Sequence, residues 1–204
     1  MIAIVDYGVG NLFSLKSSLD MIGAKAFVTG DAKEIKNADK IILPGVGAFG
    51  DAAKKLRDTG LFDVIKEEAA KGKPIMGICL GMQMLFEKSY EYGEHEGLGL
   101  IKGEIRPIEG VIPKELKIPH IGWNALKFTK DSKLFKYIKD GDFVYFVHSY
   151  YGAECDSVIA VSEYGAPLTA AVEKGNVSGC QFHPEKSGDV GLKILKAFCE
   201  SEGL

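Results

Sequence analysis

The chain has 204 residues, of which 46% are apolar and 26% are charged, and its formal net charge is -3. This length and composition are typical of one soluble globular domain and exclude two domains of ordinary size. The sequence has no block of Lys or Arg and no apolar run near the ~20 residues of a membrane span, which argues against nucleic acid and membranes as partners.

The four cysteines are widely spaced and form no C-x-x-C pair, so they indicate neither a disulfide framework nor a zinc site. The chain begins with a strand-like run and lacks the basic and apolar regions of a signal peptide. We therefore expect a cytoplasmic protein with reduced thiols and no bound metal.

Predicted strands and helices alternate in the first half of the chain. Apolar runs predict strands at 2–6, 26–28, 40–43 and 75–78, and apolar residues on one helical face predict helices at 11–22, 62–67 and from 82 to 88. Such alternation is typical of a mainly parallel sheet with helices on its faces.

The second half of the chain is richer in strands. They are predicted at 98–105, 122–128, 142–147, 158–163, 168–173 and 177–182, with a hairpin turn at 174–176 and a closing helix at 190–200. Because no repeat, low-complexity tract or linker interrupts the chain, we expect residues 1–204 to form one mixed α/β domain.

The segment Pro44–Gly50, Pro-Gly-Val-Gly-Ala-Phe-Gly, follows the strand at 40–43 and spells the G-x-G-x-x-G of dinucleotide-binding loops. Such a site belongs in the first βαβ unit and needs an acidic residue at the tip of the next strand, about 20 positions later. Here the loop follows an interior strand, and the next strand ends at Cys79. The sequence therefore argues against a dinucleotide site.

Gly45 and Gly47 flank Val46, and this spacing favours a different role. Glycines let the backbone approach a ligand closely and let a peptide plane reorient at low cost. That freedom suits backbone N–H groups aimed at a developing negative charge. The alternative is an ordinary glycine-rich turn between a strand and a helix.

Gly77-Ile78-Cys79-Leu80-Gly81 has the form of a nucleophile elbow in which cysteine replaces serine. The flanking glycines permit a tight turn from strand to helix, which projects the central side chain above the sheet edge. A helix N-terminus also favours the thiolate form of a cysteine. The alternative for Cys79 is a buried structural cysteine.

A thiolate nucleophile needs a base, and His183-Pro184-Glu185 directly follows the predicted strand at 177–182. We expect an extended segment here, in which residues i and i+2 point the same way and Glu185 orients the His183 imidazole. The alternative is a polar surface turn. His120 and His148, at strand margins, are expected to be hydrogen-bonded structural histidines.

With these patterns the chain resembles the class I, or triad, glutamine amidotransferases. The resemblance lies in Pro-Gly-Val-Gly at 44–47, Gly-Ile-Cys-Leu-Gly-Met-Gln at 77–83 and His-Pro-Glu at 183–185, and it covers essentially the whole chain. It implies a flavodoxin-like fold with a central mixed, mainly parallel sheet. It also implies hydrolysis of glutamine through a thioester on Cys79, with His183 as acid and base and Glu185 as its orienting carboxylate.

The same resemblance implies roles for residues around the nucleophile. The backbone N–H groups of Val46 and Leu80 would form the oxyanion hole. Gly47, which follows Val46, would belong to the same backbone site. Contacts with the rest of the substrate would come from Gly45, Gln83, Ser149 and Tyr150. No metal or organic cofactor is implied.

Three further stretches narrow the resemblance to one branch of the family: Asp-Tyr-Gly-Val-Gly-Asn at 6–11, Pro-His-Ile-Gly-Trp-Asn at 119–124 and Tyr-Phe-Val-His-Ser-Tyr at 145–150. In this branch the ammonia passes to a (β/α)8-barrel cyclase subunit, which makes imidazole glycerol phosphate and an aminoimidazole carboxamide ribotide in histidine biosynthesis. The resemblance implies a heterodimer with Asn11, Trp123 and Lys186 at its interface.

For these three residues a helix cap, a core side chain and a solvated lysine are the respective alternatives. The resting orientation of the Gly45–Gly47 backbone is a further hypothesis: the Val46 N–H would turn inward only when the cyclase binds its ligand. Alternative functions are a glutaminase subunit for another pathway, a different cysteine hydrolase, and a binding protein that keeps only the fold.

Overall fold

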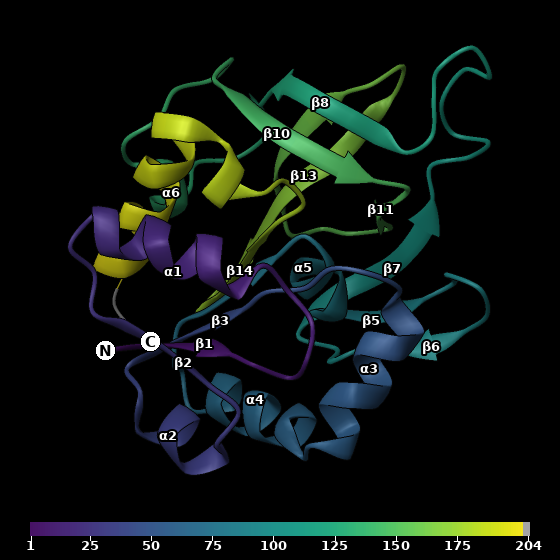
Figure 1. Cartoon of the computed structure of the whole chain (residues 1–204). Coiled ribbons are helices and arrows are strands. Elements are labelled where there is room, and N and C mark those ends of the chain that lie inside the picture. The colour runs from purple at the N-terminus through teal and green to yellow at the C-terminus, as the bar shows by residue number, and fades with distance from the viewer. Residues whose placement is uncertain (202–204) are drawn as a thin grey trace.

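The computed structural model describes residues 1–201, in which helices and three sheets form a layered α/β arrangement (Figure 1). The helical segments are α1 (Leu12–Met21), α2 (Ala32–Asn37), α3 (Phe49–Asp58), α4 (Leu61–Ala70), α5 (Leu80–Met84), α6 (Gly188–Glu200) and two 3-10 turns, η1 (Lys133–Phe135) and η2 (Pro184–Lys186). The strands are β1 (Ile2–Val5), β2 (Ala26–Thr29), β3 (Lys40–Leu43), β4 (Ile75–Ile78), β5 (Phe86–Ser89), β6 (His95–Glu96), β7 (Ile101–Pro107), β8 (His120–Ala125), β9 (Lys127–Phe128), β10 (Phe143–His148), β11 (Tyr150–Ala153), β12 (Val158–Glu163), β13 (Pro167–Lys174) and β14 (Val177–Cys180).

The central sheet has eight strands in the order β2-β1-β3-β4-β14-β13-β12-β9. The strands from β2 to β14 are parallel, and β13, β12 and β9 continue the sheet in antiparallel fashion. The mixed, mainly parallel sheet expected from the sequence is therefore confirmed. β13 and β14 pair as the predicted hairpin.

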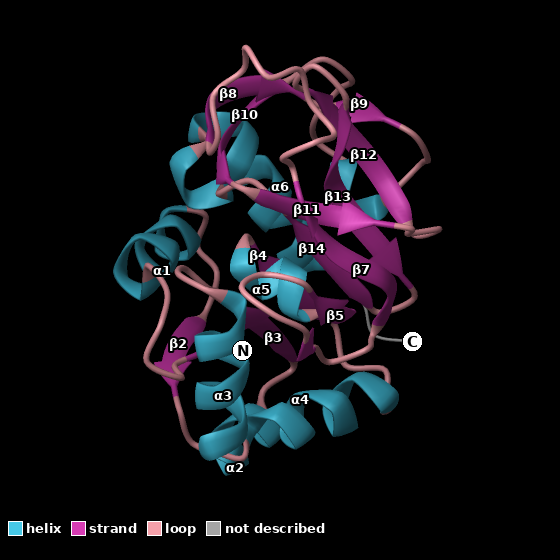
Figure 2. Ribbon diagram, turned by 90° about the vertical axis from the view of Figure 1, so that its right-hand side faces the viewer, coloured by secondary structure: helices cyan, strands magenta, loops and turns pink. Residues whose placement is uncertain are grey.

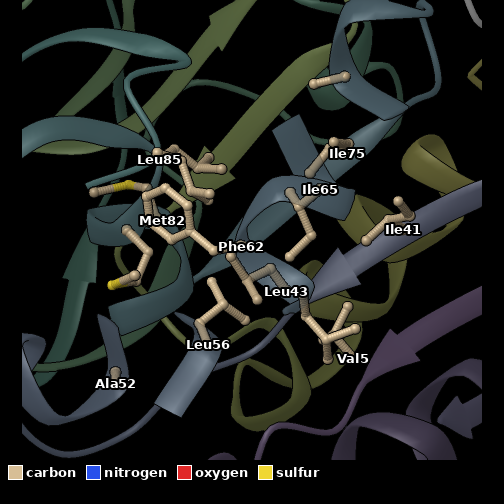
Figure 3. Close-up of a cluster of buried hydrophobic side chains, with 14 of the residues drawn as sticks. Val5, Ile41, Leu43, Ala52, Leu56, Phe62, Ile65, Ile75, Met82 and Leu85 are labelled. Carbon is tan, nitrogen blue, oxygen red and sulfur yellow. The ribbon is translucent and has the colours of Figure 1, made fainter. Parts of the chain in front are cut away.

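Helices cover both faces of the parallel part of this sheet, because β1, β3 and β4 are apolar on both sides. On one face, Val5, Ile41, Leu43 and Ile75 pack against side chains of α3 and α4, among them Leu56, Phe62 and Ile65 (Figure 3). On the other face, Ile4, Ile42 and Met76 pack against α1 and α6. Alternate residues of each strand thus enter separate cores, as strand geometry requires.

Two smaller sheets lie beside the central one (Figure 2). One is the antiparallel pair β8–β10, and the other has the order β11-β7-β5-β6. They place the segment 148–150, between β10 and β11, within reach of α5, since Gln83 Nε2 donates a hydrogen bond to the Tyr150 carbonyl at 3.3 Å.

Several predicted elements differ from the structure. The helix predicted from 82 to 88 is confirmed at 82–84 and wrong beyond Met84, where α5 ends, because Phe86–Ser89 is a strand that pairs with β7. The strand predicted at 98–105 begins at Ile101, and the one at 122–128 divides into β8 and β9. The helices α2 and α3 were not predicted.

The parallel strands β3, β4 and β14 are neighbours, so their carboxyl ends meet at one edge of the sheet. The segments that follow them begin at Pro44, Cys79 and Gln181. Ligand sites of open α/β sheets form at such an edge. Within residues 1–201, no helix is long and apolar enough to cross a membrane.

Candidate active site

Cys79 lies in the turn between β4 and α5, where its backbone has φ 54° and ψ -111°. Few residues other than glycine adopt a positive φ, and strained positions of this kind cluster at functional sites. Gly77 and Gly81 make the turn possible: a β-carbon on Gly77 would lie 2.7 Å from the Met82 Cα, and one on Gly81 would overlap the Leu43 carbonyl oxygen. The predicted elbow is present.

His183 follows β14, and its Nδ1 lies 2.8 Å from Glu185 Oε1. Both side chains are buried, with 3% of each exposed. The extended segment predicted here is wrong beyond His183, because Pro184–Lys186 form the 3-10 turn η2. Pro184 suits the first position of such a turn, and the turn still brings Glu185 to the imidazole.

The surroundings of His183 favour its protonated form. Burial alone lowers the pKa of this imidazole, but the Cys79 sulfur and the Glu185 carboxylate outweigh burial and raise the pKa to about 9. At neutral pH the His183 ring is therefore a cation that lies between the Cys79 sulfur and the Glu185 carboxylate.

The glycine loop packs directly on the elbow. A β-carbon on Gly45 would lie 2.9 Å from the Gly81 nitrogen and 2.9 Å from the Tyr7 hydroxyl, which donates a hydrogen bond to the Pro44 carbonyl at 2.8 Å. Gly47 has φ 94°. Each glycine is thus required for its own reason, close approach in the first case and a left-handed backbone in the second.

A pocket of about 300 Å³ opens over the Cys79 sulfur. Its lining contains eight residues that the sequence predicted to be functional: Val46, Gly47, Cys79, Leu80, Gln83, Ser149, Tyr150 and His183. Val46 is partly exposed, while Leu80 is the first residue of α5, whose N–H has no acceptor within the helix. Gly45 and Glu185 lie behind this lining, in contact with it.

The remaining lining residues were not predicted from the sequence, and they include the carboxylate of Glu91. Glu91 accepts a hydrogen bond from the Phe49 backbone N–H at 2.6 Å, and burial raises its pKa. Its sequence neighbourhood, rich in Glu and Tyr, resembles a solvated loop. No local pattern therefore distinguishes it from an exposed acid.

Gln181 is a second residue that sequence reasoning missed. It is fully buried, its Nε2 lies 3.7 Å from the Cys79 sulfur, and its Oε1 accepts a hydrogen bond from Gln83 at 3.0 Å. Its position two residues before His183, directly after β14, was the only sequence signal for it.

His120 and His148 form a buried pair across β8 and β10, with His120 Nδ1 3.0 Å from His148 Nε2. His148 Nδ1 lies 2.8 Å from the Tyr150 carbonyl, which accepts the hydrogen bond. Both are buried and hydrogen-bonded, as expected for structural histidines, and His148 also lines the pocket. Among residues 1–201, no group of three or more His, Cys, Asp or Glu side chains is placed to hold a metal ion.

The three predicted interface residues lie outside the pocket. Asn11 caps α1 and accepts weakly from the Ser14 N–H at 3.5 Å, Trp123 is 51% exposed on β8, and Lys186 lies in η2. Trp123 is therefore not a core side chain. Its neighbours on the outer face of the β8–β10 pair, Ile121 and Phe143, are also exposed.

The strained cysteine, the His183–Glu185 pair and the glycine loop meet at the carboxyl edge of a mixed sheet, and this arrangement fits the class of elbow-type cysteine amidohydrolases. The glutamine amidotransferase class-I family matches residues 3–201, so the chain belongs to that family. Solved structures agree with the fold. PurLQS from Thermotoga maritima superposes with a TM-score of 0.75 at 23% identity, covering 97% of this chain and 96% of the other.

Within the family, the chain is similar to proteins named imidazole glycerol phosphate synthase subunit HisH. It is 56% identical to the one from Caldanaerobacter subterraneus subsp. tengcongensis and 52% identical to the one from Oceanobacillus iheyensis, in each case over 98% of both chains. The subunit from Sulfurimonas denitrificans is 51% identical over the full length of both chains. The branch predicted from the three additional stretches is thereby confirmed.

Proposed function

We propose that this chain hydrolyses glutamine to glutamate and ammonia at Cys79, and that the ammonia passes to the cyclase subunit of an imidazole glycerol phosphate synthase. The proposal rests chiefly on one observation: the strained Cys79 lies beside the buried His183–Glu185 pair, and Cys79 and His183 line a pocket of about 300 Å³. The similarity to HisH subunits supports the choice of pathway.

The first step forms a thioester. The Cys79 thiolate attacks the side-chain amide carbon of glutamine, and the carbonyl oxygen takes the negative charge. The His183 imidazolium gives its proton to the amide nitrogen, the C–N bond breaks, and ammonia leaves. Glu185 holds the ring through Nδ1, so that Nε2 can serve Cys79 and the leaving nitrogen.

The second step restores the enzyme. Neutral His183 takes a proton from water, and the water oxygen attacks the thioester carbon. The C–S bond then breaks, glutamate is released, and Cys79 leaves as a thiolate beside the imidazolium. In both steps we assign the oxyanion to the backbone N–H groups of Val46 and Leu80, with Gly47 setting the loop conformation. One donor of this kind contributes about 3–4 kcal/mol in comparable sites.

The polar part of the pocket lining suits the α-substituents of glutamine. Glu91 places a carboxylate in the lining, where it can pair with the α-ammonium group, and Ser149 and Tyr150 add polar backbone groups to the same lining. We assign substrate binding to these residues together with Gly45 and Gln83. Charge-assisted hydrogen bonds of this type select for a zwitterionic amino acid.

We also propose that the cyclase partner is a (β/α)8 barrel and that it forms a heterodimer with residues 1–204, which act as one domain. Asn11, Trp123 and Lys186 are assigned to the interface. The exposed apolar face on β8 and β10 supports this assignment, since aromatic residues in such patches are typical of interfaces. A role in histidine biosynthesis and four free cysteines support a cytoplasmic location.

A glutamine-mimicking electrophile tests the catalytic assignment directly. Mass spectrometry should find the label on Cys79 in the native chain and no label in the Cys79→Ala variant. The other three cysteines, Cys155, Cys180 and Cys199, serve as internal controls, because burial raises the pKa of each of their thiols. Labelling that persists in Cys79→Ala would place the reactive centre elsewhere.

A further inference from the structure

A buried amide lies next to the reacting sulfur and has no role in the mechanism above. Gln181 follows β14 and none of its surface is exposed. Its backbone N–H donates to the Ala170 carbonyl at 2.8 Å, which ties the residue to β13. Its side chain then extends between Cys79 and Gln83.

The hydrogen-bond partners of Gln83 and Gln181 determine the orientation of the Gln181 amide. The Tyr150 carbonyl is only an acceptor, so the Gln83 group 3.3 Å from it must be the NH₂ group. The same Gln83 nitrogen lies 3.0 Å from Gln181, whose facing atom must therefore be the oxygen. The opposite atom of the Gln181 amide, 3.7 Å from the Cys79 sulfur, is consequently the NH₂ group.

Burial makes this orientation costly to change. Leaving a buried amide without hydrogen-bond partners costs roughly 1–3 kcal/mol of stability. The hydrogen bond from Gln83 Nε2 to Gln181 Oε1 is therefore retained. A neutral thiol is a weak acceptor, whereas a thiolate is a full anion and accepts strongly. The Gln181 N–H thus gains most when the sulfur is charged.

We propose that Gln181 is a catalytic residue whose Nε2–H donates a hydrogen bond to the Cys79 thiolate. The bond is formed before the sulfur attacks, is weakened in the thioester, and is formed again when the C–S bond breaks and sulfur takes the electron pair. Gln83 acts as a positioning residue, because it holds the Gln181 oxygen. The inference rests on the function proposed above for Cys79.

Two consequences follow for the two steps of the reaction. A stabilised thiolate is present over a wider pH range, although each thiolate is a somewhat weaker nucleophile. A stabilised thiolate is also a better leaving group, so the hydrogen bond increases the rate of thioester breakdown more than the rate of thioester formation. Loss of the donor should therefore slow deacylation more than acylation.

The Gln181→Met variant removes the donor while filling a similar volume, and Gln181→Asn keeps an amide but withdraws it by one methylene. Ser178→Ala is the matched control, because Ser178 is a buried polar residue on β14, the strand that leads to Gln181, and its hydroxyl donates to the Ile75 carbonyl instead. The full-length chains are alkylated with iodoacetamide across pH, which requires no glutamine.

We expect the pH midpoint of Cys79 alkylation to rise by about one unit in both Gln181 variants and to stay unchanged in Ser178→Ala. With glutamine, the glutamyl thioester should accumulate in the Gln181 variants, and its hydrolysis should slow about 10-fold. An unchanged midpoint in a folded Gln181 variant would overturn the proposal.

The native chain offers an independent reading, because Gln83 and Gln181 are its only glutamines. With ¹⁵N in the glutamine side chains, the Gln181 NH₂ signals should shift with the same pH midpoint as Cys79 alkylation, and that shift should vanish in Cys79→Ala. Gln181 NH₂ signals that do not shift with the pH midpoint of Cys79 alkylation would contradict the proposal. If glutamine hydrolysis is absent but this coupling is present, the proposed function fails while the hydrogen bond stands.

Discussion

At the scale of single residues, the elbow depends on the absence of side chains around Cys79. The cysteine keeps φ 54° because β4 and α5 are held on either side of it, and Gly81 lets α5 pass directly against the Leu43 carbonyl. A strained backbone at the nucleophile persists only where the surrounding packing imposes it. The stability of this turn and the exposure of the sulfur are therefore linked.

The Gly81→Ala substitution should disrupt the close packing of α5 against the Leu43 carbonyl. Because its β-carbon would overlap the Leu43 carbonyl oxygen, we expect the free energy of unfolding to fall by about 3 kcal/mol or more and glutaminase activity to be lost. Denaturant unfolding measures the first effect. Gly23→Ala is the matched control: Gly23 has φ 73° but open space around it, so only about 1–2 kcal/mol should be lost. Equal losses in the two variants would refute the packing argument.

Glu185→Gln tests the orienting carboxylate. Glutamine has the same shape as glutamate, but it cannot stabilise the His183 cation, and its NH₂ group can turn toward Nδ1 and impose the wrong tautomer. We expect kcat to fall roughly 10³- to 10⁴-fold, with a much smaller change in KM. Steady-state kinetics together with a thermal melt would check this. A kcat within a few-fold of the native value would show that Glu185 is structural.

At the scale of elements, the antiparallel pair β8–β10 carries a buried histidine pair, and Val147 and His148 of β10 line the pocket. Burial, opposed in part by the bond to the Tyr150 carbonyl, lowers the pKa of His148 to about 4. His120 stacks on Tyr164 with ring centroids 4.0 Å apart, and burial also lowers its pKa. The β8–β10 pair therefore holds both imidazole rings, His120 and His148, in their neutral form.

This arrangement predicts a pH dependence of stability. A depressed pKa in the folded state means that the unfolded chain binds more protons between pH 6.5 and about 4. Stability from His148 is thus complete above pH 6.5 and lost as the pH falls toward 4, by about 3 kcal/mol in total. Urea unfolding across this range should show a smaller loss in His148→Gln. An equally steep loss in that variant would assign it to other groups.

The outer face of the same sheet leads to a prediction about the partner. Trp123 is half exposed beside Tyr145, at a ring-centroid distance of 6.0 Å, and a large aromatic side chain in such a patch is a typical binding hot spot. Trp123→Ala should weaken binding of the cyclase by about 2 kcal/mol and leave the stability of the isolated chain almost unchanged.

Titration calorimetry against the cyclase would measure the loss for Trp123→Ala. Val28→Ala is the control, since Val28 is a comparably exposed apolar residue on the edge strand β2 of the central sheet. If both variants bind as tightly as the native chain, the β8–β10 face is not the docking surface.

At the scale of the whole molecule, the parallel core and the site at its edge could be predicted from the sequence. Continuous apolar runs such as Ile41–Leu43 fit only strands buried on both sides, and the segments after β3, β4 and β14 carried glycine, cysteine and histidine in recognisable patterns. Because these strands are parallel neighbours, the three patterns meet at one edge.

The rest of the fold depended on tertiary packing. Residues 82–88 fit a helical pattern, but Phe86 lies in the core beside β7, and strand pairing outweighs helical propensity there. Glu91 and Gln181 were missed for a related reason. An acid in a polar loop and an amide after a strand acquire a role only when distant segments bring a ligand pocket or a sulfur next to them.

The central claim is that Cys79 hydrolyses glutamine on behalf of a cyclase, and glutamate release tests it most directly. The measurement uses this chain alone and with purified cyclase plus the cyclase ligand, with Cys79→Ala as control. We predict weak release by the chain alone, strong release with the liganded cyclase, and none from Cys79→Ala. Release that is strong without the cyclase and indifferent to it would move the chain to another pathway, and the absence of any Cys79-dependent release would contradict the account.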